Sequence, residues 1–241
     1  MPFVAEENEL SDKLKLWRFM KFEKFCSTLQ AGGLFYTSLA SFEDPFEAIL
    51  PKRYYSSRYL ASQKIKIKPG PLRAIELDQD FNRRHVGANC WNCSNVEPEF
   101  FWKIYSDLEY GIAIKSNVKR LKKAHALVTK DIYIRNVVYE NIVIKDTSDF
   151  LNFHKNNVLE KAHFKRPHFS QEKEVRCLVQ LDQPRRGTPV TGEMIKVNLF
   201  DLVEEIVFSP NSPKWFQDVV QEAKSKYGYA QIKCSTSSLI Y

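Results

Sequence analysis

Residues 14–37 read LKLWRFMKFEKFCSTLQAGGLFYT, and this stretch decides the fold class. Apolar and polar side chains alternate over residues 14–19, with the two-residue period of a half-buried strand. Residues 22–29 instead space their apolar side chains as a helix does, until Gly32 and Gly33 end the pattern. The apolar residues that follow the glycines predict a second strand. A strand, helix, strand opening indicates an α+β protein.

Similar patterns continue along the chain. Further strands are predicted at residues 88–93, 111–114, 131–139, 174–181, 193–197, 204–208 and 229–234. Further helices are predicted at residues 97–107, 119–123, 148–163 and 214–227. We expect a mixed, largely antiparallel sheet core with flanking helices, folded as a single domain over residues 1–241. A stretch rich in Lys, Arg and Tyr at residues 52–84 is expected to form a basic insertion or lid.

Composition limits the cellular setting and the partners. The chain has 241 residues, of which 44% are hydrophobic, so it can bury a sizeable core. It has no apolar run near the roughly 20 residues that cross a bilayer, and its N-terminus lacks a secretory pattern. With five cysteines, an odd number, we expect free thiols and a cytoplasmic location. The net charge of +7 suits an anionic small molecule or nucleic acid, or reflects solvated lysines.

Charged residues alternate in the predicted strand that begins EKEVR. Glu172, Glu174 and Arg176 then share one face, while Val175 and Cys177 point to the other. If the charged face meets solvent, the three form a weak salt-bridged ladder. If it lines a cleft, Arg176 can hold one carboxylate ionised, while the other polarises a hydroxyl or stabilises a cationic transition state.

Other charged residues lie inside apolar segments. Arg18 follows Trp17 in the first strand, where its guanidinium suits a bidentate grip on phosphate or carboxylate. The alternative is a structural ion pair with Asp44 or Glu47. These two acidic residues occur in an EDPFE turn, and either they contribute to a ligand site or they only cap the turn and anchor its loop.

Aromatic residues recur on the predicted helix 97–107. Trp102 and Tyr105 are three residues apart and share a face, which is typical of core packing. The alternative is an aromatic surface for a ring-shaped ligand.

A CxxC pair, Cys90 and Cys93, raises the question of a metal site. Zinc needs a second pair of ligands, and no matching Cys or His motif occurs elsewhere. We therefore interpret both as structural and expect no metal. The sequence also lacks the Rossmann, P-loop, HExxH and GxSxG motifs, so those chemistries have no support.

These motifs together resemble a family of bacterial proteins classed as a domain of unknown function. The shared features are a WR-aromatic strand, a DPFE segment, a CW strand, a WKxY helix, a GIAI strand and an ExExR strand, here at residues 17–19, 44–47, 90–91, 102–105, 111–114 and 172–176. The chain departs from the family at Asn92, where many relatives carry His, and in the lysine-rich stretch after Pro51. The resemblance covers most of the chain and brings no established activity.

The order of these residues is also similar to that in Arg-Ser-Glu ADP-ribosyltransferases, an analogy at the level of fold. It implies an ADP-ribosyltransferase-like sheet and NAD as co-substrate. Arg18 would grip the NAD phosphates, Ser94 would support the nicotinamide side, and Glu174 would stabilise the oxocarbenium-like centre. Trp102 or Tyr105 would form a stacking surface.

Three hypotheses remain open at this point. The first is an NAD-consuming transferase or glycohydrolase, as in a toxin or phage-defence effector. The second is a basic module that binds a nucleotide or nucleic acid without catalysis. The third is a structural protein whose charged residues form an internal ion-pair network.

Overall fold

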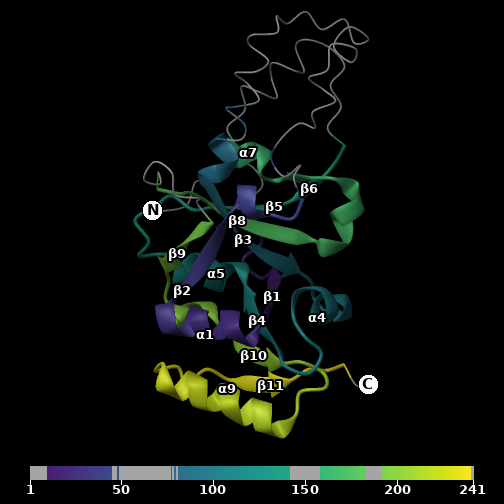
Figure 1. Ribbon diagram of the computed structural model, residues 1–241, viewed down its shortest axis with the longest axis vertical. Coiled ribbons are helices and arrows are strands. Elements are labelled where there is room, and N and C mark those ends of the chain that lie inside the picture. Colours follow the sequence, from purple (N-terminus) through teal and green to yellow (C-terminus); the bar gives the residue numbers. More distant parts are fainter. Residues whose placement is uncertain are drawn as a thin grey trace, which may run out of the picture.

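The computed structural model describes most of the chain (Figure 1). The described residues are 10–44, 48, 77, 79, 81–141, 158–182 and 191–239. Most of the basic stretch at 52–84 lies outside them, as do Glu47 and residues 148–157 of a predicted helix. The predictions for those positions therefore stay predictions.

The first three elements are those that the opening stretch predicts. Strand β1 (Lys15–Lys21) leads directly into helix α1 (Phe22–Ala31), and strand β2 (Gly33–Ser38) follows. Gly32 ends the helix in the left-handed region, at φ 60°, where its N–H caps the carbonyl of Leu29. Both β1 and β2 run antiparallel to the same later strand, β3 (Val86–Cys93), so they are parallel to each other.

A nine-stranded sheet forms the centre of the molecule (Figure 1). Its order is β11-β10-β4-β1-β3-β2-β9, with β8 along the far edge of β3 and β5 along β8. The remaining strands are β3 (Val86–Cys93), β4 (Gly111–Asn117), β5 (Tyr133–Asn136), β8 (Glu174–Gln180), β9 (Gly192–Lys196), β10 (Glu205–Phe208) and β11 (Cys234–Thr236). Among the described pairs of this sheet only β10 and β11 are parallel, which confirms a mixed, largely antiparallel sheet.

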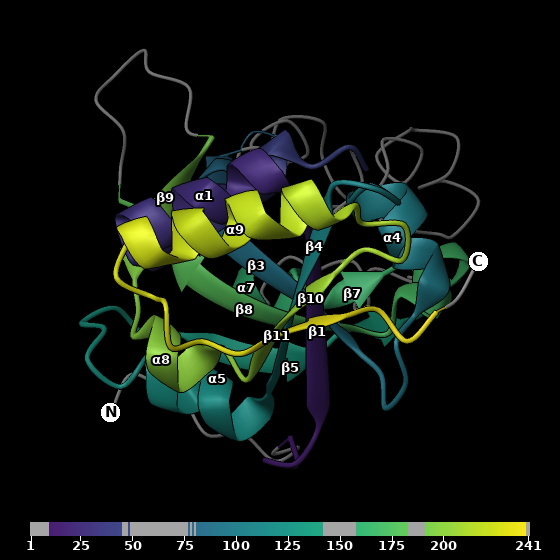
Figure 2. The ribbon, with the colours of Figure 1, turned by 90° about the horizontal axis from the view of Figure 1, so that it is seen from below.

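Helices pack around this sheet, as Figure 2 shows from below. The longest, α9 (Lys214–Lys226), lies beside α1, and the rings of Phe22 and Phe216 meet at 5.3 Å. The shorter helices are α4 (Glu99–Tyr105), α5 (Val118–Ala124), α7 (Val158–Lys161) and α8 (Leu199–Leu202), with 3-10 turns η1 (Leu39–Ser41) and η3 (Pro167–Glu172). Strands β6 (Val138–Tyr139) and β7 (Phe164–Lys165) form a small second sheet.

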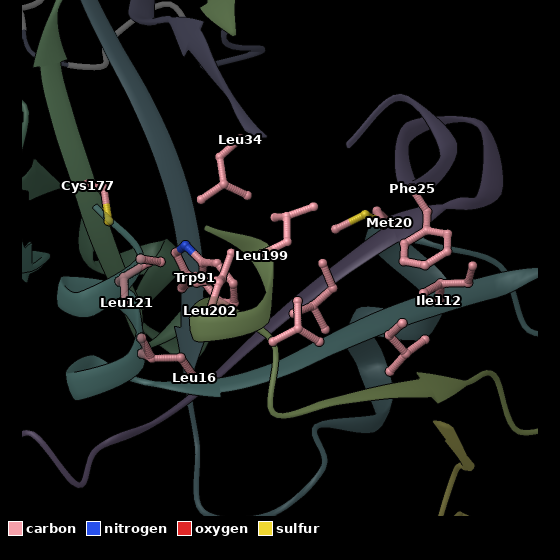
Figure 3. Close-up of a cluster of buried hydrophobic side chains, with 14 of the residues drawn as sticks. Leu16, Met20, Phe25, Leu34, Trp91, Ile112, Leu121, Cys177, Leu199 and Leu202 are labelled. Atoms are coloured by element: carbon pink, nitrogen blue, oxygen red, sulfur yellow. The ribbon is translucent and has the colours of Figure 1, made fainter. Parts of the chain in front are cut away.

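The main core lies between one sheet face and helices α1, α5, α8 and α9 (Figure 3). Leu16 and Met20 of β1 point into it, together with Val175 and Cys177 of β8. Trp17 and Phe19 point to the opposite face, where they pack with α4 in a separate cluster. The alternation in the sequence is therefore confirmed: β8 puts Val175 and Cys177 on the predicted core side, and successive residues of β1 point to opposite faces.

Two predicted elements differ from the structure. Residues 229–233 form a turn instead of a strand, closed by the Ile232 N–H on the carbonyl of Tyr229, and β11 begins only at Cys234. The strand predicted at 131–139 is divided into β5 and β6. Within the described part of the chain, no helix is long and apolar enough to cross a membrane.

Candidate functional site

A gap between β1 and β2 creates the candidate site. One edge of β3 pairs with β8 along residues 86–92. Its other edge pairs with β2 at Ala88 and with β1 at Asn92, and between these points it has neither strand as a neighbour. Helix α1 joins β1 to β2 across the gap. The first two strands of the chain therefore lie along the same edge of β3, one at each end of the gap.

A cavity of about 630 Å³ occupies this gap. Its lining comes from β1, α1, β2, β3, α4, η3 and β8, so segments far apart in the sequence meet there. Five of the predicted site residues are among them: Arg18, Asp44, Tyr105, Glu172 and Glu174. A cavity of this size is in the range of small-molecule and cofactor sites.

Glu174 lies at the start of β8, and its carboxylate is almost fully buried. Arg176 holds it from behind with two parallel bonds, from Nε to Oε1 at 2.9 Å and from Nη2 to Oε2 at 3.0 Å. Burial alone would raise the pKa of Glu174, but the charge and hydrogen bonds of Arg176, together with Lys165, lower it to about 2. The carboxylate therefore stays ionised at any physiological pH.

Arg176 is fully buried and does not line the cavity. Its remaining nitrogen donates to the carbonyl of Ala162 at 2.7 Å. The solvent-exposed ladder, which the sequence left open as one reading of these charges, is therefore excluded for Glu174 and Arg176. Arg176 is placed to position Glu174 and to keep it charged.

Glu172 extends the charged surface toward the cavity mouth. Lys165 Nζ bonds its Oε2 at 2.6 Å and reaches Glu174 Oε2 at 3.5 Å. The hydroxyl of Tyr105 donates to Glu172 Oε1 at 3.1 Å, and burial followed by the charge of Glu172 raises the pKa of Tyr105. Lys165 thus links two carboxylates whose charges would otherwise repel each other.

Arg18 occupies the gap itself. Its Nη1 donates to the main-chain carbonyl of Cys90 at 2.8 Å, on the part of β3 that faces the gap, and its guanidinium lies 6.0 Å from the ring centre of Trp91. Burial lowers the pKa of Arg18, as expected for a cation that lacks a close counterion. Among the residues that the structure describes, no carboxylate forms a salt bridge with it, so its outward nitrogens are available to an anion.

The thiol of Cys90 lies beside the carboxylate of Glu174. Burial, then the charge of Glu174, raises the pKa of Cys90 well above its ordinary value. The neutral thiol hydrogen-bonds the carboxylate, which contributes to the low pKa of Glu174. All five cysteines are free thiols, and the described residues hold no group of His, Cys, Asp and Glu side chains that could bind a metal.

The other predicted residues lie around or outside the cavity. Asp44 lines it and pairs with Arg166 at 3.0 Å, while Glu47 lies outside the described residues. Ser94 does not line the cavity; its carbonyl accepts from Trp17 Nε1 at 3.1 Å. Trp102 also does not line it, because it is fully buried against Phe19 with its Nε1 on Glu97. Of the two aromatic candidates, only Tyr105 faces the cavity.

Several lining residues carry no signal that sequence reasoning used. Phe42 and Phe169 add aromatic surface, and each ring lies near a cation, Arg176 for Phe42 and Lys165 for Phe169. Asn92 lies between Trp17 and Glu174 across the strands and also lines the cavity. The sequence marks it only as a departure from the motif pattern of the family that the chain resembles.

Comparison with known proteins agrees with the motif resemblance. Residues 101–177 match the model of a family described as a protein of unknown function, DUF2971. No functionally curated protein matches the chain. Among solved structures, Thermus sp. 2.9 DarT in complex with ADP-ribosylated ssDNA aligns over 96% of this chain and 97% of its own, with 9% identity and a TM-score of 0.41. The segment that holds the WKxY, GIAI and ExExR motifs thus matches an uncharacterised family, as the sequence predicts.

Proposed function

We propose that this protein is an ADP-ribosyltransferase-like enzyme that breaks the nicotinamide glycosidic bond of NAD in the cavity between β1 and β2. One observation carries the proposal. An ionised carboxylate, Glu174, and an arginine without a carboxylate partner among the described residues, Arg18, line the same cavity. This combination suits a substrate that has a diphosphate and develops a positive charge next to it.

The chemistry needs a fixed negative charge more than an acid. When the bond from C1′ of the ribose to the nicotinamide nitrogen breaks, its electron pair leaves with the nicotinamide, which becomes neutral. Positive charge then develops on C1′ and the ring oxygen. A carboxylate that is already ionised and held in place stabilises this charge without reorganisation. An acceptor nucleophile, or water, then forms the new bond to C1′ and loses its proton.

Glu174 and Glu172 suit different parts of this reaction. Glu174 is held in one orientation by Arg176 and stays ionised, so we assign it the stabilisation of the cationic centre. Glu172 is the more exposed of the two, at 16% against 7% for the side chain, so we assign it the proton of the incoming acceptor. Arg176 bonds Glu174 but does not line the cavity, so it would contact neither the cationic centre nor the acceptor and is a positioning residue.

Arg18 suits the diphosphate. A guanidinium presents several donors in one plane and grips phosphate oxygens in pairs. Among the described residues, the guanidinium of Arg18 bonds only the carbonyl of Cys90, through Nη1, so its other donors are left for a ligand of the cavity that Arg18 lines. Lys24 of α1 lines the same cavity and adds a second positive charge.

Loss of NAD tests this function directly. Wild-type protein is incubated with NAD and with water, protein, DNA or RNA as acceptors, and nicotinamide release is followed by chromatography. We expect Glu174→Gln to lower the rate by about 100-fold or more, as loss of one electrostatic group in a catalytic site does. The matched control is Glu222→Gln, an exposed carboxylate on α9 that does not line the cavity. Stable NAD with every acceptor, or equal rates for Glu174→Gln and wild type, would refute the proposal.

A second candidate function rests on the net charge of +7, which favours nucleic acid as a bound partner or as the acceptor. Binding to a fluorescent single-stranded oligonucleotide should weaken steeply with salt and should be the same for Glu174→Gln. Absent binding at low ionic strength, or binding that ignores salt, would remove nucleic acid from consideration.

A further inference from the structure

We propose that Asn92 recognises the carboxamide of the nicotinamide ring, by accepting a hydrogen bond from its N–H on Oδ1. This inference rests on the proposed function, because it assigns the substrate group that one residue of that cavity selects. It begins from an unexplained feature. Asn92 lines the cavity and is 5% exposed, and its buried Oδ1 has no hydrogen-bond partner in the part of the chain that the structure describes.

The orientation of the Asn92 amide is fixed by chemistry. Its Nδ2 donates to the main-chain carbonyl of Glu172 at 2.6 Å. Rotating the amide by half a turn would bring two acceptors, Oδ1 and that carbonyl, into contact and would lose the bond. Oδ1 must therefore point away from Glu172, as an acceptor only. A buried acceptor left without a donor is rare in folded proteins, and at a functional site it indicates a ligand group that completes it.

The neighbours of Asn92 indicate which ligand group this is. In the sheet register it pairs with Glu174 on one side and with Trp17 on the other, so all three side chains project from the same face. Directly opposite residues have Cβ atoms about 4.5–5.5 Å apart. In NAD the carboxamide is separated from the reacting C1′ by the pyridine ring alone. A substrate with C1′ at Glu174 therefore has its carboxamide within the reach of Asn92.

The aromatic surface around Asn92 suits the same group. Trp17 and Tyr105 both line the cavity, and the flat faces of such rings favour a planar ligand such as a pyridine. A carboxamide supplies the N–H that Oδ1 needs. A ketone or a carboxylate in its place has no N–H, and a carboxylate would also add a second negative charge close to Glu174 and Glu172.

Three dinucleotides that differ in the group attached to the pyridine ring test this contact. NAD has the carboxamide. The 3-acetylpyridine analogue of NAD has nearly the same shape and charge but a methyl group in place of the NH2. The nicotinic acid analogue has a carboxylate. We expect Glu174→Gln protein, in which Asn92 is intact, to bind NAD roughly 10- to 100-fold more tightly than the acetylpyridine analogue, because the analogue leaves Oδ1 without a donor. The nicotinic acid analogue should bind more weakly still.

Two variants complete the experiment. Binding is measured by calorimetry in Glu174→Gln protein, which keeps the cavity shape but turns over little substrate, and in the same protein that also carries Asn92→Leu. Leu resembles Asn in shape and has no acceptor. We expect the second protein to bind NAD and the acetylpyridine analogue equally. Far-UV circular dichroism and melting temperature verify that it is folded.

The outcomes distinguish the inference from the proposed function. Equal binding of NAD and the acetylpyridine analogue by Glu174→Gln protein, absence of NAD binding, or a preference that survives Asn92→Leu would each overturn the role of Asn92. If Asn92→Leu fails to fold, the ligand series with Asn92 intact still decides. If NAD binds with the expected preference but wild-type protein never cleaves it, the inference stands and the transferase function falls.

Discussion

Two arginines in the sheet are held in opposite ways. Arg176 is fully buried, and its three nitrogens bond the carboxylate of Glu174 and the carbonyl of Ala162. Arg18 is only partly buried, and the one hydrogen bond that it makes within the described part of the chain goes to the carbonyl of Cys90. All three nitrogens of Arg176 are therefore hydrogen-bonded within the protein, whereas Arg18 keeps N–H donors for a ligand.

This difference separates an arginine buried behind the cavity from one that lines it. A buried ion pair orients its members and keeps them charged, but it leaves little for a ligand. An arginine that faces a cavity without a carboxylate partner among the described residues is electrostatically incomplete until an anion binds. The hypothesis of an internal ion-pair network therefore fits Arg176, and the hypothesis of an anion site fits Arg18.

The largest effect is expected from breaking the ion pair of Arg176 and Glu174. Arg176→Met leaves Glu174 as a buried carboxylate with its main partner removed, so the free energy of unfolding should fall by about 3–5 kcal/mol. Urea denaturation measures this. Arg18→Met is the matched control, and it should lower stability by less than about 1 kcal/mol because only one carbonyl loses its donor. Similar losses for the two variants would contradict the distinction between these arginines.

Acid should destabilise the protein through the buried side chain of His163. Burial, then the charges of Arg135 and Arg176, lowers the pKa of His163 to about 3. The unfolded chain takes up this proton below about pH 6.5, whereas the folded chain does not, so protonation favours unfolding as pH falls. We expect stability to fall by about 3 kcal/mol between pH 6.5 and pH 4 from this residue alone.

His163→Phe tests that expectation. Denaturation curves at several pH values should show a smaller loss over this window for His163→Phe than for wild type. His168→Phe, which replaces an exposed histidine, is the control and should keep the wild-type response. An unchanged pH dependence in His163→Phe would show that other groups cause the acid sensitivity.

Replacing Arg18 tests whether this arginine binds the phosphates of a ligand. Arg18→Gln keeps a donor for the carbonyl of Cys90 but removes the charge. We expect ADP-ribose, which cannot undergo the cleavage, to bind about 10- to 100-fold more weakly by calorimetry. Stability should change by less than about 1 kcal/mol. Unchanged ADP-ribose affinity would exclude Arg18 as the phosphate contact.

The smallest effect is expected at the mouth of the cavity. Tyr105→Phe removes the hydroxyl that donates to Glu172, but this bond is near solvent, so stability should change by less than about 1 kcal/mol. Trp102→Phe, on the same helix, should be more costly because that ring is fully buried. Thermal melts compare the two variants. A larger loss of melting temperature for Tyr105→Phe than for Trp102→Phe would contradict this order.

Local patterns were sufficient to predict the elements that carry the site. The alternation in KLWRF separates Leu16 from Trp17, and that in EKEVR separates Glu174 from Val175, because the pleat of a strand imposes a period of two. Gly32 marks the end of α1 because it adopts a positive φ. The alternation around Tyr229 predicts a strand, and this prediction is wrong. Hydrogen bonds to α9 and within a turn decide the conformation of Tyr229 instead.

Local sequence patterns do not show which strands pair with each other. The gap exists because β3 pairs with β2 at one end and with β1 at the other, and pairings at such sequence distances leave no local signal. Trp102 and Tyr105 look equivalent in the sequence, yet packing against Phe19 buries only Trp102. No local pattern marks Asn92 as a site residue, because the orientation of its amide depends on the carbonyl of Glu172, which follows 80 positions later.

The position of β1 in the sheet has a consequence for synthesis of the protein. The first strand pairs on one side with β4 and on the other with β3. Strand β3 also pairs with β8, which comes much later in the chain. Long separations between paired segments slow folding. A chain still emerging from the ribosome would therefore lack the cavity until β8 had been made. If the protein consumes NAD, the cell that makes it is exposed to that activity only after most of the chain has been translated.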